Sequence, residues 1–198
     1  MPEAEIRFVA NKKMYYMLDE LIITLKKYES DLKNYNDLFE EITIGSRTRL
    51  VEEGDTIKNI YFIKKGCLRL WFDNQGNDIT LQFFFEDQVV SGFIEGDKSM
   101  FTIESLEPTT IVKIKKSDFE NLLKEIPELK DQYLEFVIQR LANYSRLFLS
   151  RIKDKPKVRY HLLIKENPEI LQRAAQHYIA SYLGITSVSL SRIRNKKS

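Results

Sequence analysis

The side chains with the clearest chemical potential lie close to the end of the chain. Hydroxyl groups recur from Thr186 to Ser191, two guanidinium groups follow at Arg192 and Arg194, and two lysines come next. Arginine can donate a pair of hydrogen bonds to guanine, while serine hydroxyls and a helix N-terminus suit phosphate oxygens. This chemistry predicts contact with double-stranded DNA. The candidate contact residues are Thr186, Ser187, Val188, Ser189, Ser191, Arg192, Arg194, Lys196 and Lys197.

The elements that must position these residues form a recognisable pattern of helix, tight turn and helix. Ala180 is small where two helices must approach closely, Gly184 can adopt the left-handed conformation that ends a helix, and Thr186 can cap the next one. In a helix-turn-helix the second helix enters the major groove with its N-terminal residues on the base edges. The alternative is a helical hairpin that only closes a basic tail.

The charges of the 198-residue chain are segregated. Residues 1–150 contain 20 basic and 26 acidic side chains, whereas residues 151–198 contain 11 basic and 3 acidic ones. A small basic module at one end is the electrostatic footprint of a nucleic-acid-binding protein, because neutralised phosphates supply most non-specific affinity. A solvated lysine-rich helical tail would show the same bias.

A long helix without Gly or Pro is predicted from Glu128 to about Lys153. Apolar residues follow at alternating spacings of three and four, as in the seam of a coiled coil. This pattern predicts a dimerisation helix, and the alternative is a helix that packs on its own domain through Ile138, Leu147 and Ile152. The predicted dimer contacts are Leu134, Val137, Leu141, Tyr144 and Phe148.

The first part of the chain changes from helix to strand. An amphipathic helix is predicted over residues 14–29, and residues 42–116 are rich in β-branched and aromatic residues separated by turn signals. Short strands at this spacing predict a small sandwich or barrel, with a hairpin loop at residues 74–77. Ser117 is expected to cap the helix that follows, and Pro127 to separate it from the long helix.

Several classes of protein are excluded. The composition, with 43% hydrophobic and 30% charged residues, is that of a soluble globular protein, and the charged start of the chain does not resemble a signal peptide. We therefore expect a cytoplasmic protein with no membrane partner. The only cysteine, Cys67, cannot form an internal disulfide or hold an iron–sulfur cluster. Residues 42–116 contain no histidine, so we expect no metal, no cofactor and no enzyme.

The order of these elements resembles that of the Crp/Fnr superfamily of bacterial transcription regulators. Within this superfamily, the sequence is most similar in character to the group found in Bacteroidetes. The phrases IASYLGIT and LSRIR in the last element, with YFIKKGCLRLWF and ITLQFFFEDQ in the β region, carry this resemblance, which covers essentially the whole chain. It implies an α+β fold with an N-terminal double-stranded β-helix or jelly roll of the cyclic-nucleotide-binding type in residues 1–127. A dimerisation helix would occupy residues 128–153, and a small all-α helix-turn-helix domain residues 154–198. Since the sequence ends at Ser198, we expect no two-stranded wing.

The resemblance also implies a function. The chain would be a homodimeric transcription regulator whose partners are double-stranded DNA, a second copy, RNA polymerase and a small-molecule effector. The positions that reach bases in the family correspond to Ser187, Val188 and Arg192. Val188 stands where an acidic residue is common, so we expect an unusual operator. The competing interpretation is a ligand-binding or dimeric adaptor module with a non-functional DNA-binding domain.

A second departure from the family concerns the effector. Members that bind cyclic nucleotides carry a Gly-Glu pair followed by Arg-Ser or Arg-Thr, because the cyclic phosphate needs backbone N–H groups and a guanidinium fork. Here residues 91–93 are Ser-Gly-Phe, and Ser99 or Met100 stands in place of the arginine. We therefore expect no useful affinity for cyclic AMP. The candidate residues of another effector pocket are Phe83, Phe85, Ser91, Gly92, Phe93 and Ser99, with simple core packing of the aromatic residues as the alternative.

Overall fold

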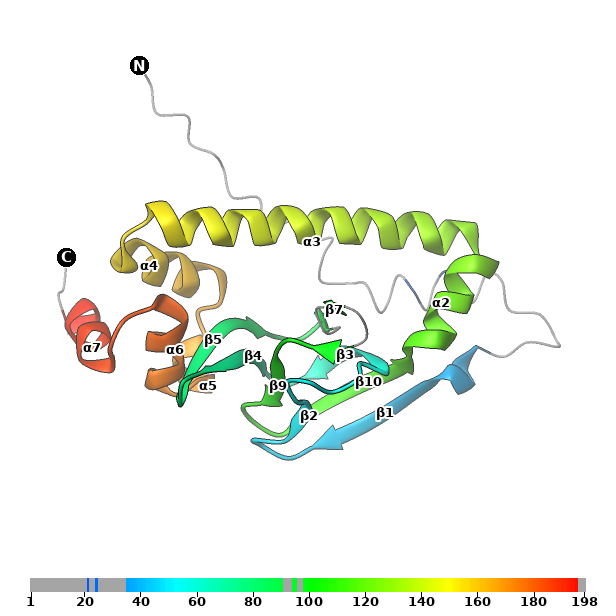
Figure 1. The fold of residues 1–198 in the computed structure, drawn as a ribbon, viewed down its shortest axis with the longest axis horizontal. Coiled ribbons are helices and arrows are strands. Elements are labelled where there is room, and N and C mark those ends of the chain that lie inside the picture. Colours follow the sequence, from blue (N-terminus) through cyan, green and yellow to red (C-terminus); the bar gives the residue numbers. More distant parts are fainter. Residues whose placement is uncertain (1–20, 22–23, 25–34, 91–93, 96–97, 196–198) are drawn as a thin grey trace, which may run out of the picture.

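The computed structural model describes residues 21, 24, 35–90, 94–95 and 98–195. Of the helix predicted over residues 14–29, Leu21 and Thr24 are helical and the other positions lie outside the described residues. A roll of β-strands forms the body of the molecule, one long helix runs along it, and four shorter helices gather at one end (Figure 1). This arrangement confirms the predicted α+β fold with a β-roll followed by helices.

The roll consists of two four-stranded antiparallel sheets, in the orders β1-β10-β3-β6 and β2-β9-β4-β5, and a small pair, β7-β8. It spans residues 39–115, close to the predicted range of 42–116. A short 3-10 turn, η2 (Asn36–Leu38), precedes it. The strands are β1 (Phe39–Ile44), β2 (Arg49–Val51), β3 (Asn59–Lys65), β4 (Leu68–Asn74), β5 (Asn77–Phe84), β6 (Val89–Val90), β7 (Ile94–Glu95), β8 (Lys98–Ser99), β9 (Thr102–Ser105) and β10 (Thr109–Lys115).

Strands β4 and β5 form the predicted hairpin. Asn74 pairs with Asn77, and the two residues between them, Gln75 and Gly76, have φ values of 56° and 84°. Two consecutive positive φ angles are typical of the tight turn that matches the twist of two antiparallel strands. The carboxylate of Asp73 accepts a hydrogen bond from the Gly76 N–H at 3.0 Å and closes the loop.

The alternation of side chains along the strands creates three hydrophobic clusters. Ile63 of one sheet and Leu70 of the other pack together in the interior of the roll. Phe62, next to Ile63, points to the opposite face of its sheet and packs with Phe119 and Leu122. Because successive side chains of a strand point to opposite faces, each sheet has an outer face that needs a cover. Helix α2 (Lys116–Glu125) covers one of them, and the C-terminal helices cover the other.

The helices after the roll begin and end close to the predicted positions. Pro127 is the first residue of α3 (Pro127–Lys153), whose 27 residues correspond to about 40 Å of helix. The predicted cap at Ser117 is wrong: α2 begins at Lys116, directly after β10, and the Ser117 hydroxyl contacts Asp118 inside the helix. The remaining helices are α4 (Pro156–Glu166), α5 (Ile170–Arg173), α6 (Gln176–Leu183) and α7 (Ser187–Asn195).

Candidate nucleic-acid interface

Helices α6 and α7 are joined by the tight turn that the sequence predicts. Gly184 has φ 65° and ψ 36°, and this left-handed conformation lets its own N–H and that of Ile185 bond to carbonyls in the last turn of α6. Thr186 Oγ1 then accepts a hydrogen bond from Ser189 N–H at 3.2 Å, as an N-cap residue does. Local sequence signals therefore determine the geometry between the two helices.

Helix α7 has one buried side and one exposed side. Leu190 is buried and Ile193 half-buried, and both belong to the cluster shared with α6. Five of the nine predicted DNA contacts lie on the exposed side of α7, and Thr186, directly before the helix, is also exposed; Ser189 is half-buried, and Lys196 and Lys197 lie outside the described residues. The exposed five are Ser187, Val188, Ser191, Arg192 and Arg194.

The hydroxyls of Thr186 and Ser189 have a structural role. Their oxygen atoms lie 3.1 Å apart, and Thr186 also caps the helix, so both groups fix the start of α7. Sequence reasoning missed Asn195, which is exposed and donates from Nδ2 to Ser191 Oγ at 3.5 Å. The exposed side of α7 thus carries hydroxyl, amide and guanidinium groups, which suit base edges and phosphates.

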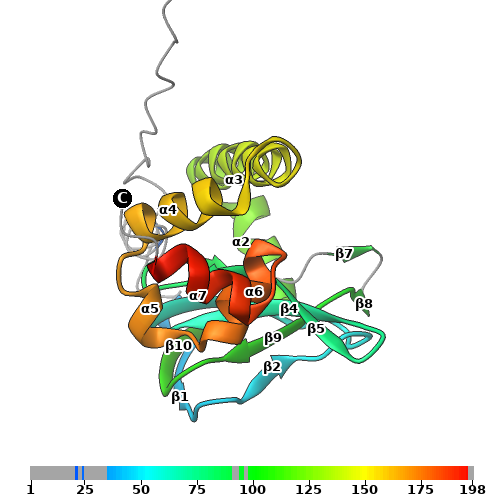
Figure 2. The same cartoon turned by 90° about the vertical axis from the view of Figure 1, so that its left-hand side faces the viewer.

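Helices α4 to α7 form the C-terminal helical unit, and the side of this unit away from α7 packs on the roll. Figure 2 shows α6 lying beside β4 and β5. The cluster beneath it joins Phe83 and Phe85 to Ile179 and Leu183 of α6, and the rings of Phe83 and Tyr182 are 5.5 Å apart. The residues after 154 therefore share one hydrophobic core with the outer face of the sheet β2-β9-β4-β5.

This docking involves two residues of the predicted effector pocket. Phe83 and Phe85 point away from the interior of the roll and are covered by the C-terminal helices, whereas Phe84 between them lies in the interior. The Ser99 hydroxyl is engaged with the backbone of Phe101, to which it donates at 2.6 Å. Ser91, Gly92 and Phe93 lie outside the described residues. Phe83 and Phe85 therefore lie in the core shared with the C-terminal helices, which is the simple core packing given as the alternative.

A buried arginine lies at the centre of the docked surface. Arg69 on β4 is 1% exposed, and its Nη2 lies 2.6 Å from Glu104 Oε1 and 3.1 Å from Asp78 Oδ2. Its guanidinium lies 3.7 Å from the ring centre of Tyr178 on α6 and 4.8 Å from that of Trp71. A guanidinium keeps its charge when buried if carboxylates and aromatic faces replace water. Arg69 thus presents a charged, partnered group on which α6 rests.

A second charged cluster binds the C-terminal helices to the edge of the roll. Arg173 at the end of α5 contacts Glu86 at 2.7 Å and Glu107 at 2.5 Å. The hydrogen bonding that Arg173 donates to Glu86 is the largest of the effects that raise the pKa of Arg173. Burial alone would raise the pKa of Glu86, but its hydrogen bonds with Arg173 and with the Gly66 N–H hold that pKa below its usual value. The pair is therefore fully charged near neutral pH.

Gly66 is required for this cluster. Its φ is 111°, and a side chain there would meet the backbone of Thr109, whose Cα lies 2.8 Å from the position of an added Cβ. The Gly66 N–H donates to Glu86 at 2.7 Å.

The neighbouring Cys67 is fully buried, and its burial raises its pKa to about 12, so the thiol stays protonated at neutral pH.

The connection between α3 and α4 has two residues, which form hydrogen bonds of their own. Ser150 Oγ donates to Asp154 Oδ2 at 2.7 Å. Arg159 donates to the Asp154 carbonyl at 2.8 Å and also to the Leu183 carbonyl at the end of α6. One guanidinium thus joins the start of the C-terminal region to the turn of the helix-turn-helix.

Helix α3 leaves an apolar row in solvent. Leu134, Leu141 and Phe148 of the predicted seam are 57%, 65% and 65% exposed, and Val137 is also exposed. Ile138 and Ile152, which the alternative interpretation would pack on the chain's own domain, are 59% and 69% exposed. We call the exposed residues of α3 the α3 row: Leu134, Val137, Ile138, Leu141, Phe148, Leu149 and Ile152.

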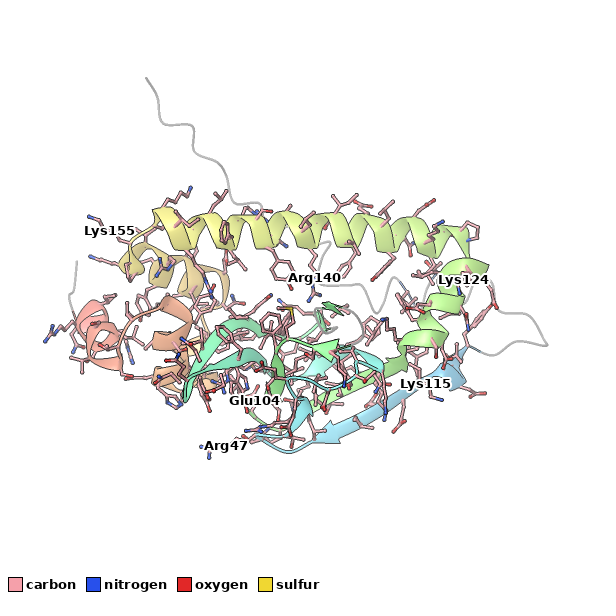
Figure 3. The ribbon with its side chains drawn as sticks, in the orientation of Figure 1. Arg47, Glu104, Lys115, Lys124, Arg140 and Lys155 are labelled. Carbon is pink, nitrogen blue, oxygen red and sulfur yellow. The ribbon has the colours of Figure 1, made fainter. Side chains whose placement is uncertain are left out.

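Tyr144 does not belong to the α3 row. Its hydroxyl accepts a hydrogen bond from Arg140 Nε at 3.0 Å, and Arg140 also donates to the Val89 carbonyl at 2.7 Å. Arg140 points from α3 toward the roll (Figure 3). Burial raises the pKa of Tyr144. Tyr144 follows the spacing of the seam but lies on the side that faces the chain's own β-roll.

The fold and these surfaces define a class of protein in which a β-roll is joined through one long helix to a helix-turn-helix. Residues 41–126 match the family model of the cyclic nucleotide-binding domain. FixK2 from Bradyrhizobium japonicum has a similar structure, with a TM-score of 0.68, 16% identity, and coverage of 80% of this chain and 83% of that chain. The c-di-GMP-responsive global regulator CLP from Xanthomonas campestris has a TM-score of 0.67, 15% identity, and coverage of 88% and 90%.

A protein from Eubacterium rectale that is placed in the Crp/Fnr family is also similar. Its TM-score is 0.65 at 18% identity, with coverage of 90% of this chain and 85% of that chain. The chain therefore shares the fold of these regulators, and residues 41–126 match the cyclic nucleotide-binding domain, so the resemblance in the sequence is confirmed at the level of the fold. A search of curated protein sequences found no match.

Two further observations concern other classes of site. Within the described ranges, no group of three or more His, Cys, Asp and Glu side chains is arranged to hold a metal ion. Within the same ranges, no helix has the length and apolar character needed to cross a membrane.

Proposed function

We propose that the protein is a homodimeric, DNA-binding transcription regulator without enzymatic activity. The observation that carries this proposal is the division of the helix-turn-helix into a docked side and an exposed side. Helix α6 is covered by the roll, whereas α7 presents Ser187, Ser191 and Arg192 to solvent. A recognition helix must be free to enter the major groove while the rest of its domain is held in place.

Self-association supplies the second half of the proposal. The α3 row is apolar and exposed over about five turns of helix, and a second copy can cover it by packing α3 against α3. A twofold dimer would present two α7 helices, and an operator with twofold symmetry requires them about 34 Å apart. Asp154 to Pro156 would set this separation, and a signal at the roll would act by favouring one arrangement over another.

The effector in this proposal is not cyclic AMP. A cyclic phosphate is bound by backbone N–H groups and a guanidinium fork, and the sequence has Ser99 or Met100 where the arginine of the family stands, with Lys98 nearby. A lysine provides one point charge and cannot replace the bidentate contact. Isothermal titration is expected to detect no binding of cyclic AMP at micromolar concentrations. Micromolar or tighter binding would contradict the proposal.

Binding-site selection from random duplexes tests the function. The wild-type protein should enrich a twofold symmetric sequence, and Arg192→Ala should lose preference at the contacted guanine, a change of about tenfold in discrimination. The comparison variant, Lys196→Ala with Lys197→Ala, should weaken binding to all duplexes alike, because lysines contact phosphates. Unaltered sequence preference in Arg192→Ala would show that α7 is not the recognition helix.

A further inference from the structure

We propose that Val188 contacts the 5-methyl group of a thymine in each half-site of the operator. This inference rests on the proposed function and adds the identity of one base. Val188 lies in the first turn of α7 and is 62% exposed. The first turn of a recognition helix is the part that reaches base edges, so its exposed side chains determine which bases are accepted.

Val188 does not contribute to holding α7 in place. The residues that do so are Leu190, which is buried, and Ile193, which is half-buried against α6. A single exposed apolar residue is common on protein surfaces, so exposure alone would not carry the inference. The position of Val188 supports the inference. Val188 precedes Arg192 by one helical turn, and both side chains are exposed on the same side of α7.

The chemistry of the side chain selects the base. A thymine presents a methyl group in the major groove, while cytosine presents an amino donor that a carboxylate can accept. Among the residues Ser187–Asn195 of α7 there is no Asp or Glu, so this helix has no carboxylate for cytosine. An isopropyl group against the cytosine amino group would leave that donor without a partner. Val188 therefore favours thymine through an apolar contact and disfavours cytosine through an unmade hydrogen bond.

The spacing of the two side chains predicts the spacing of the two bases. Four residues of helix rise about 6 Å, and neighbouring base pairs are about 3.4 Å apart. If Arg192 donates to guanine, the thymine contacted by Val188 lies within about two base pairs of that guanine. The half-site is thus expected to contain both bases at a fixed short separation.

The test uses the full-length protein and the operator recovered by binding-site selection. Replacing the predicted thymine by deoxyuridine in one half-site removes a single methyl group, and wild-type affinity should fall about fourfold, the effect of one buried methyl group. Val188→Ala should bind the thymine and uracil operators within twofold of each other. Deoxyuridine at a thymine outside the half-sites serves as the control and should leave affinity unchanged.

A second variant tests the same contact in the opposite direction. Val188→Glu should select cytosine at this position, because the new carboxylate can accept from the amino group. Since Val188 is exposed, neither variant should change the unfolding temperature. Equal wild-type affinity for thymine and uracil, or an unchanged uracil effect in Val188→Ala, would overturn the assignment of Val188 alone. Failure of the wild type to select any sequence would instead overturn the proposed function.

Discussion

The two sides of the C-terminal helical unit both carry arginines, but Arg173 of the docked side has carboxylate partners, whereas the arginines of the exposed side have none among the described residues. On the docked side, Arg173 contacts three carboxylates, those of Glu86, Glu107 and Glu169. On the exposed side, Arg192 and Arg194 have no ion pair with any residue of the described chain. A guanidinium that has partners within the molecule fixes its structure, and one that has none is available to an external anion. The difference separates residues that hold the helix-turn-helix from residues that the proposal assigns to DNA contact.

The α3 row is a third surface, which differs from both the docked side and the exposed side. Its side chains are apolar, unlike those of the exposed side of α7, and they are not covered by the β-roll as the docked side is. Leu141→Glu should have the largest effect of the changes considered, because it would bury a carboxylate in a dimer interface at a cost of several kcal/mol. Sedimentation should show monomers at micromolar concentrations. Ala142→Glu, one residue along and outside the row, should remain dimeric, and a dimeric Leu141→Glu would remove the α3 row from the interface.

A smaller effect is expected on the docked side. Arg173→Gln removes charged hydrogen bonds to Glu86 and Glu107 and should lower the free energy of unfolding by about 2 kcal/mol. For a chain of this size, the unfolding temperature should fall by about 4–8 °C in calorimetry. Arg49→Gln is the matched control, because Arg49 pairs with Glu52 on the surface and its loss should cost less than about 0.5 kcal/mol. Identical unfolding of Arg173→Gln and the control would show that the cluster does not hold the docked side.

Local signals in the sequence predicted much of the fold. The hairpin at residues 74–77 needed only turn residues with positive φ, and the turn between α6 and α7 needed only Gly184 and Thr186. These features depend on a few neighbouring residues, which is why spacing and residue type were sufficient. The exposure of Arg192 agrees with the helical spacing, because Leu190 and Ile193 turn toward α6 on the other side of α7.

The contacts between distant parts of the chain could not be predicted in this way. Phe83 and Phe85 have the spacing of a strand face, but that spacing does not say which face lies inside the roll. Tyr144 has the spacing of the seam, and only its contact with Arg140 assigns it to the other side of α3. Arg69 gave no signal at all, because its partners Glu104 and Tyr178 lie 35 and 109 positions away in the sequence.

The most direct test of the central claim is the affinity of the purified protein for duplex DNA as a function of salt concentration. The charged and hydroxyl-bearing side of α7 and the basic residues near it should neutralise several phosphates in each subunit, so the logarithm of the association constant should fall steeply and linearly with the logarithm of salt concentration. Fluorescence anisotropy of a labelled operator should show this slope. No binding at low ionic strength would contradict the claim that the exposed side of the helix-turn-helix contacts DNA, and would leave the molecule as a dimeric adaptor.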